Sequence, residues 1–94
     1  MIRLASRMPF VYALSLENGK KYIGYSNNVE NRLNQHFTGS GAQWTQKNKP
    51  ISVDKLIYCP NTHYAKKLET KLYYNFKNYY GTERVRGAGY SKSY

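Results

Sequence analysis

The sequence has few acidic residues, a single cysteine and no long hydrophobic run, and each scarcity excludes a class of protein. Five Asp and Glu stand against fifteen Lys and Arg, which gives a formal net charge of +10 in 94 residues. No two carboxylates lie close together in the sequence, so a site that holds two metal ions between several acids is not expected. A Ser-centred nucleophile elbow, a phosphate-cradling GxxxxGK loop and zinc-ligand spacings are also missing from the sequence.

Cysteine content and hydropathy indicate where such a chain works. Cys59 cannot form an internal disulfide bond and has no Cys or His partner at metal-site spacing. No apolar run approaches the ~20 residues of a membrane span, and residues 1–9 lack the apolar stretch of a signal peptide. No basic helix carries the Trp, Phe and Leu face of a membrane-surface helix. We therefore expect a protein of a reducing intracellular compartment, the cytoplasm or a eukaryotic nucleus, without a membrane partner.

The positive charge is spread along the whole chain, and this distribution predicts a polyanionic partner. Nucleic acid is favoured, because Lys and Arg that neutralise phosphates release counterions and give affinity without sequence readout. The alternative is a surface charge that only keeps the protein soluble.

The length fits one domain of residues 1–94, with a core of about 9–80 and a Gly-rich basic tail over 81–94. Short apolar runs, an Asn-Gly turn and Asn residues before apolar stripes predict three strands and two helices, joined by one long loop. The fold class is therefore α+β, with a small three-stranded antiparallel or mixed sheet flanked by helices in the order β-β-α-β-α. The predicted elements are strands 10–16, 21–25 and 52–59, a helix 28–37 with Val29, Leu33 and Phe37 inward, a loop 39–50, and a helix after Pro60-Asn61-Thr62 with Ala65, Leu68, Leu72, Tyr73 and Phe76 inward.

Glu69 is the unusual acid of the sequence. It lies between Ala65 and Leu72 on the inward stripe of the second predicted helix, where a carboxylate is costly unless something pairs with it. A structural salt bridge with a Lys or Arg would explain it. A role as metal ligand or general base would also explain it, and both interpretations stay open from the residues alone.

Arg32 and His36 are four residues apart, so they share one face of the first predicted helix. An Arg beside a His can grip and polarise a phosphate, although on a basic domain such a pair is also typical of a solvated face. Tyr12 and Tyr22 stand in the paired strands around the Asn-Gly turn. Taken singly, tyrosines in strands indicate ordinary packing.

The run "VYALSLENGKKYIGYSNNVENRLNQH" resembles the GIY-YIG nuclease module. "FVY" at Phe10 to Tyr12 stands in place of the first triplet, "YIG" at Tyr22 to Gly24 stands for the second, and nine residues separate the two tyrosines. Arg32 and His36 stand at the positions of the family's helix Arg and His. The resemblance covers about residues 9–76.

Two further segments of the sequence resemble particular parts of this family's domain. "QHFTGSGAQWTQKNKP" is similar to the loop of single-domain bacterial members and of eukaryotic structure-specific nuclease subunits, and "AKKLETKL" places Glu69 where the family keeps its metal-binding Glu. Phe10 and Val11 replace Gly and Ile of the first triplet, which retains the Tyr12 hydroxyl. The Asn that many members carry late in the domain has no assigned counterpart here; the uncertain stand-ins are Asn75, Asn78 and Ser91.

The resemblance implies an endonuclease that hydrolyses DNA phosphodiester bonds with one divalent ion, Mg²⁺ or Mn²⁺, in repair or recombination. Glu69 would hold the ion, and Arg32 would stabilise the charge that builds on the phosphate oxygens. Tyr12 would activate the attacking water as a phenolate-type base or by relay, Tyr22 would orient the water or the phosphate, and His36 would assist as a hydrogen bonder or proton relay. Glu69 is the expected metal ligand, and all five are expected catalytic residues.

A free tyrosine titrates near ~10, so a base at Tyr12 would need cations that lower its pKa. Lys20, Lys21 and Arg32 are the candidates. Cations and one aromatic ring are also expected at the DNA surface, and the tail adds phosphate contacts without base readout. Trp44 has the alternative of covering the open side of a small core. The predicted DNA-binding residues are Lys20, Lys21, Trp44, Lys47, Lys49, Arg84 and Arg86.

The expected partner is nicked, branched or plain duplex DNA, together with a second copy or a partner subunit where the module acts in an assembly. Two other functions remain open from the sequence. One is a nucleic-acid-binding module without cleavage, and the other is an interaction subunit that docks on an acidic partner.

Overall fold

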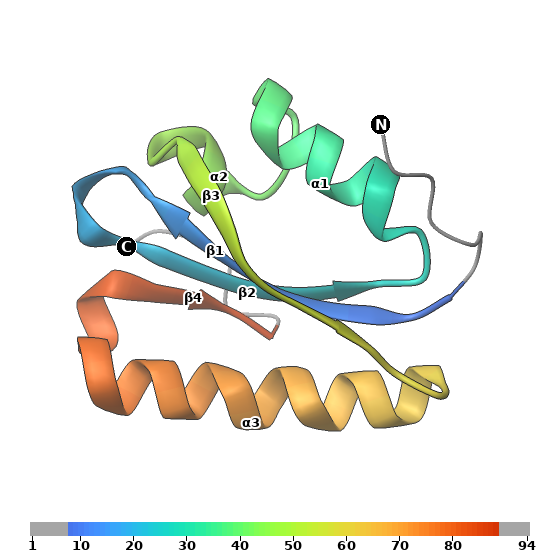
Figure 1. The fold of residues 1–94 in the computed structure, drawn as a ribbon. Helices are drawn as coiled ribbons and strands as arrows, with labels where there is room; N and C mark the ends of the chain where they lie inside the picture. The colour runs from blue at the N-terminus through green and yellow to red at the C-terminus, as the bar shows by residue number, and fades with distance from the viewer. Residues whose placement is uncertain (1–7, 89–94) are drawn as a thin grey trace.

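The computed structural model describes residues 8–88, which form a four-stranded mixed sheet with helices on both faces. The sheet order is β3-β1-β2-β4, where β1 is Phe10–Leu16, β2 is Lys21–Ser26, β3 is Pro50–Tyr58 and β4 is Val85–Gly87. Helix α3 (Thr62–Tyr80) runs along one face, and α1 (Val29–Thr38) and α2 (Gln43–Lys47) cover the other (Figure 1). The predicted α+β class is confirmed.

The β1–β2 hairpin forms where the Asn-Gly turn predicts it. A short 3-10 turn, η1 (Glu17–Gly19), joins the strands, and Asn18 and Gly19 adopt φ values of 64° and 69°. These left-handed values are the reason for the Asn-Gly pair. The antiparallel register then places Tyr12 opposite Gly24 and Leu14 opposite Tyr22.

The fourth strand is a correction to the sequence prediction, which placed this segment in a basic tail. After a second 3-10 turn, η2 (Thr82–Arg84), β4 pairs in parallel with β2, with Ile23 opposite Gly87. A side chain at Gly87 is not possible without rearrangement, because its Cβ would lie 2.0 Å from the Ile23 carbonyl oxygen and φ is 139°. The close approach of these two backbones therefore requires this glycine.

The helices begin at the predicted caps. Asn28 accepts a hydrogen bond from the Asn31 amide at the start of α1, and Asn61 accepts one from the Tyr64 amide at the start of α3. The segment 39–50 differs from the prediction, since it contains the five-residue helix α2 instead of being a loop throughout. None of the helices among residues 8–88 is long and apolar enough to cross a membrane.

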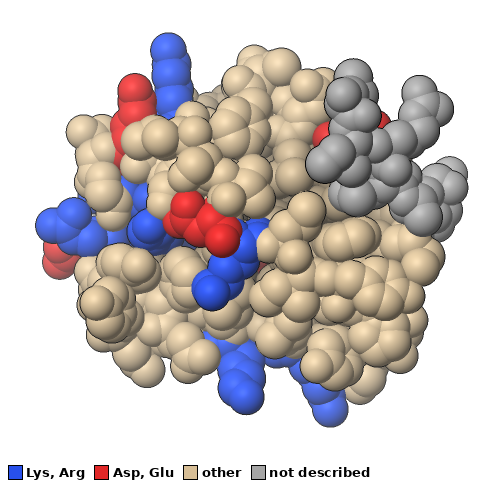
Figure 2. Space-filling model, viewed as in Figure 1, with Lys and Arg blue, Asp and Glu red and all other residues tan. Residues whose placement is uncertain are grey.

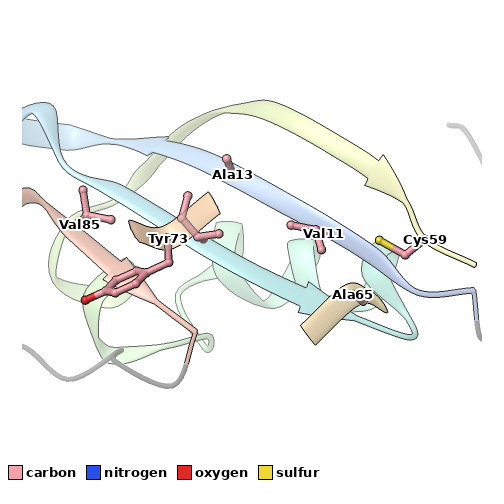
Figure 3. Close-up of a cluster of buried hydrophobic side chains, with 7 residues drawn as sticks. Val11, Ala13, Cys59, Ala65, Tyr73 and Val85 are labelled. Atoms are coloured by element: carbon pink, nitrogen blue, oxygen red, sulfur yellow. The ribbon is translucent and has the colours of Figure 1, made fainter. Parts of the chain in front are cut away.

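Two separate hydrophobic cores pack on the two faces of the sheet. Between the sheet and α3 lie Val11, Ala13, Ile23, Cys59, Ala65, Tyr73 and Val85 (Figure 3). Between the sheet and the other two helices lie Tyr12, Leu14, Leu16, Tyr22, Val29 and Trp44. The alternation along β1 sends successive side chains to opposite faces.

Helix α1 is rotated relative to the prediction. Phe37, expected to face inward with Val29 and Leu33, is 45% exposed, whereas His36 is fully buried. The polar residue occupies the inward position because its ring makes hydrogen bonds on both sides, as described below.

Candidate active site

Three aromatic rings from separate elements meet on the face of the sheet that α1 and α2 cover. The ring of His36 lies 5.6 Å from the ring of Tyr12 and 5.0 Å from the ring of Tyr22, measured between centroids. The two tyrosine rings are 6.3 Å apart. The strand register and the last turn of α1 therefore bring Tyr12, Tyr22 and His36 together, three of the five predicted catalytic residues.

Both nitrogens of the His36 ring have hydrogen-bond partners. Nε2 is 2.7 Å from the hydroxyl oxygen of Tyr12, and Nδ1 is 3.0 Å from Oγ1 of Thr45 on α2. Burial, with a smaller contribution from the positive charge of Arg32, lowers the pKa of His36 to about 4. His36 is therefore a neutral imidazole at neutral pH.

The pKa of Tyr12 is raised in the fold, whereas a phenolate base at Tyr12 would need a lowered pKa. Burial raises it above the ordinary value of 10.0, and the negative charge that a second phenolate at Tyr22 would carry raises it further. Arg32 lowers it through its charge and a hydrogen bond, but does not outweigh burial. Lys21 does not help, because it lies on the α3 face of the sheet and binds Asp54 at 3.2 Å and Ser15 at 2.6 Å.

Arg32 lies beside both tyrosine hydroxyls. It forms a hydrogen bond with each phenol, and its charge lowers the pKa of each; burial nevertheless raises the pKa of Tyr22 as well. Its Nη1 also donates to the side-chain oxygen of Gln35 at 2.9 Å, one turn further along α1. The half-buried Arg32 guanidinium is thus held beside the two phenol oxygens. Its planar set of N–H donors suits an anionic oxygen ligand.

Glu69 reaches the same place from the opposite face of the sheet. Strand β4 ends at Gly87 and covers β2 only as far as Ile23, and the backbone amide of Ala88 donates a hydrogen bond to the Glu69 carboxylate. The carboxylate lies close enough to raise the pKa values of Tyr12 and Tyr22 by its charge. Tyr12, Tyr22, Arg32, His36 and Glu69 therefore converge.

The salt-bridge interpretation of Glu69 is not realised, since no Lys or Arg within residues 8–88 forms an ion pair with it. Burial raises its pKa to about 7, because the charged carboxylate lacks a cation that would compensate for lost water. No group of three or more His, Cys, Asp or Glu side chains within the described range could hold a metal ion. A single hard oxygen donor fits an ion such as Mg²⁺, which keeps several waters and binds through one or two carboxylates plus substrate phosphates.

Two residues at this site escaped the sequence prediction. Thr45 is 1% exposed and binds His36, and the sequence marks it only by its position a few residues after a Gly-rich loop. Gly41 lies against the His36 ring, where a Cβ would be 2.3 Å from Nδ1. The Gly-rich loop therefore closes over the histidine.

The predicted DNA-binding residues separate into buried and surface groups. Trp44 is 5% exposed and donates from Nε1 to the Lys21 carbonyl at 3.0 Å, so it covers the core, the alternative that the sequence left open. Arg86 is also 5% exposed, with its guanidinium carbon 4.4 Å from the centre of the Trp44 ring. Trp44 and Arg86 therefore cover one another in this structure, and their role in DNA binding stays a prediction.

Three other cations gather at the hairpin turn η1. Lys49 is fixed there by a bond from the Glu17 amide to its carbonyl at 2.8 Å, and Nζ of Lys20 donates to the Glu83 carbonyl at 3.5 Å. Nη1 of Arg84 lies against Gly19. In Figure 2, basic side chains project from this end of the molecule, interspersed with acidic ones. Lys47 is exposed on α2 nearby in sequence.

The stand-ins for the family's late Asn remain unassigned. Asn75 and Asn78 lie in α3, six and nine residues after Glu69, and both are exposed. Ser91 lies outside the described residues.

Comparison with known sequences gives the family. Residues 8–82 match the sequence model of the GIY-YIG catalytic domain. The chain belongs to the GIY-YIG family. It is 36% identical over 91 residues to a UPF0213 protein of Bacillus licheniformis, which covers 86% of this chain and 88% of that protein. No solved structure matches the chain significantly.

Other relatives carry the same UPF0213 name. The chain is 34% identical over 68 residues to one of Nitratidesulfovibrio vulgaris, with 72% of this chain and 62% of that protein covered. It is 30% identical over 77 residues to one of Staphylococcus epidermidis, with 82% and 89% covered. The GIY-YIG domain is that of a nuclease family, and the names of these relatives state no activity.

Proposed function

We propose that this protein is a metal-dependent DNA endonuclease that hydrolyses phosphodiester bonds with one divalent ion. The observation that carries the proposal is the convergence of five functional side chains from both faces of the sheet. Arg32 and Glu69 both act on the pKa values of Tyr12 and Tyr22, although they come from α1 and α3. The family of the chain supports the reaction class.

The charged groups divide the work on the phosphate. The Arg32 guanidinium donates hydrogen bonds to the non-bridging oxygens and stabilises the charge that builds on them. The ionised Glu69 carboxylate would hold the ion, which would supply Lewis-acid chemistry to the phosphate. Tyr22 hydrogen-bonds the water or the phosphate and fixes its orientation.

The attacking water is activated by the pair of Tyr12 and His36. The raised pKa of Tyr12 disfavours a standing phenolate, so relay of the proton to His36 is the better of the two expected routes. The imidazole accepts more readily once an anionic phosphate is bound close by, because the negative charge favours the imidazolium. Tyr12 then relays the proton from the water to His36 and stays neutral.

The cations at the hairpin turn provide affinity for the DNA backbone. Lys20, Lys49 and Arg84 lie at the end of β1 and β2 beside η1, and Tyr22 is the second residue of β2. Contacts of this kind are made to phosphates and carry no sequence information. The proposed substrate is therefore DNA of nicked, branched or plain duplex form, selected by shape.

The test incubates the purified protein with nicked, branched and plain duplex DNA in Mg²⁺, and separately in Mn²⁺. Glu69→Gln is the matched control, since the amide keeps the size and the bond from Ala88 but cannot bind the ion as a carboxylate does. Cleavage by the wild type that is lost in Glu69→Gln supports the proposal. Equal background cleavage by both proteins would overturn it, and salt-dependent DNA binding without cleavage would indicate a binding module.

A further inference from the structure

A chain of three hydrogen bonds starts at Tyr12 and ends at the backbone of the Gly-rich loop. The Tyr12 oxygen is 2.7 Å from Nε2 of His36, and Nδ1 of His36 is 3.0 Å from Oγ1 of Thr45. Oγ1 of Thr45 donates to the carbonyl of Ala42 at 2.8 Å. His36 and Thr45 are 0% and 1% exposed, so the chain is closed to bulk water between its ends.

The last bond fixes the direction of the other two. A threonine hydroxyl has one proton, and a carbonyl can only accept. Because Thr45 gives its proton to Ala42, its oxygen accepts from His36, and Nδ1 carries the imidazole proton. In the Nε2–H tautomer the Thr45 hydroxyl would donate to Nδ1 instead. Oγ1 of Thr45 and the carbonyl oxygen of Ala42 would then lie 2.8 Å apart with no proton between them.

The Gly-rich loop also lies against Nδ1 of His36. A Cβ at Gly41 would lie 2.3 Å from Nδ1 of His36, so the backbone of the loop closes over this nitrogen. Thr45 is thus the hydrogen-bond partner that the fold provides for Nδ1, and no buried side-chain nitrogen or oxygen within residues 8–88 lacks a partner.

We propose that Thr45 is a positioning residue that holds His36 in the Nδ1–H tautomer and thereby makes Tyr12 donate its proton to Nε2. One lone pair of the Tyr12 oxygen takes the hydrogen bond from Arg32, and the other is then free to accept a hydrogen bond from the attacking water. The effect on cleavage rests on the proposed nuclease function, whereas the tautomer can be measured without it.

The proton movements balance in one step. The water gives a proton to the Tyr12 oxygen as its own oxygen bonds to phosphorus, and the Tyr12 proton moves to Nε2 of His36. The bond from phosphorus to the leaving oxygen breaks, and that oxygen keeps the electron pair until it takes a proton from solvent. Tyr12 ends as a neutral phenol and His36 as an imidazolium, whose Nδ1–H still donates to Thr45. With Nε2 already protonated, this path is blocked.

The first test measures the tautomer by nitrogen-15 NMR of the imidazole rings at pH 7.5, in protein without DNA or metal. The chain has two histidines, and the exposed His63 serves as the internal comparison. We expect His36 to show one protonated nitrogen, Nδ1, in the wild type and in Thr45→Ser. Thr45→Val keeps the shape and lacks the hydroxyl, so it should shift His36 toward Nε2–H. A wild-type Nε2–H form, or a Thr45→Val spectrum unchanged from wild type, would overturn the proposal.

The second test compares cleavage by the same proteins. Thr45→Val should lower kcat about 10- to 100-fold, the range found when a group that orients a metal-bound His is lost, with little change in KM. Thr45→Ser should restore most of the rate. A loss of rate in both variants alike would indicate a packing role and contradict the proposal. Because the NMR arm needs no cleavage, a protein that cuts no DNA would overturn the nuclease function and leave the tautomer assignment to be judged on its own spectrum.

Discussion

The phenol ring of Tyr12 lies across Gly24, the residue opposite it in the β1–β2 register. A Cβ on Gly24 would lie 2.5 Å from the Tyr12 oxygen and 2.6 Å from its Cζ. We expect Gly24→Ala to displace the ring, weaken the bond to His36 and lower the free energy of unfolding by about 1–3 kcal/mol. Urea unfolding measures the loss, and the rate of DNA cleavage should fall with it.

A double-mutant cycle isolates the cause. In a Tyr12→Ala background there is no ring for the new methyl group to displace, so Gly24→Ala should cost little further stability. An equal cost in both backgrounds would show that the clash lies elsewhere in the strand.

His36 should make the protein sensitive to acid. Its folded pKa of about 4 lies below the ordinary value of 6.5, so between these values the unfolded chain binds a proton that the folded protein does not. The stability that neutral His36 contributes is present above pH 6.5 and is lost as the pH falls through 4, by up to about 3 kcal/mol. Unfolding free energies of the wild type and His36→Gln, measured from pH 7.5 to 4, should therefore converge toward acid.

His63→Gln is the control for this slope, because His63 is exposed at the start of α3. A convergence toward acid as large for His63→Gln as for His36→Gln would show that the slope does not come from His36. Glu69 is present in all three proteins, so its own pH dependence cancels in the comparison. Parallel profiles for the wild type and His36→Gln would contradict a lowered pKa at His36.

Glu69 should carry the opposite pH dependence. Its folded pKa of about 7 lies above its ordinary value of 4.5, so the folded protein holds a proton that the unfolded chain has already lost. Stability from this group is present below pH 4.5 and is lost as the pH rises through 7. Glu69→Gln should thus be more stable than wild type at pH 8, by roughly 1 kcal/mol after allowance for solvent screening, and equal to it at pH 4.

Metal addition separates the two roles of this carboxylate. Mg²⁺ should raise the melting temperature of the wild type at pH 8 and less at pH 6, since only the ionised form binds it. Glu69→Gln should not respond at either pH. A melting temperature that Mg²⁺ raises equally in both proteins would place the binding site elsewhere.

The parts of the fold that depend on local chemistry could be predicted from the sequence. The Asn-Gly turn and the caps at Asn28 and Asn61 act within a few residues, and the structure has all three. Strand β4 could not be predicted this way, because three residues in a basic segment gain their order only from parallel pairing with β2. Helix α2, with five residues, is likewise too short to show a helical period.

The site divides along the same line. The spacing of the family motifs indicated Tyr12 and Glu69. It did not indicate that the Glu69 carboxylate comes close to Tyr12 beyond the end of β4. The burial of His36 in place of Phe37 depends on partners from other elements, one of them Thr45 on α2. The net rise of the Tyr12 pKa likewise follows from burial, which a count of neighbouring cations in the sequence does not report.

Arg84 and Arg86 should differ sharply, although both were expected at the DNA surface. Arg84 is exposed in η2, whereas Arg86 donates from Nη1 to the carbonyls of Thr82 at 2.8 Å and Val85 at 2.9 Å and stacks on Trp44. Arg84→Ala should leave stability within about 0.5 kcal/mol and reduce the slope of log K against log salt by about 1, the signature of one lost phosphate contact.

Arg86→Ala should lower stability and leave the salt dependence of DNA binding unchanged. Removal of its guanidinium takes away a buried cation–π contact worth about 2 kcal/mol and exposes the Trp44 ring, so unfolding should occur at lower urea concentration. Under conditions in which the variant is folded, its salt slope for DNA binding should equal that of wild type. Arg86→Lys keeps the charge but not the planar fork and should recover only part of the stability, because the stacking on Trp44 depends on shape. A normal urea midpoint together with a reduced salt slope in Arg86→Ala would mean that Arg86 leaves the core to bind DNA.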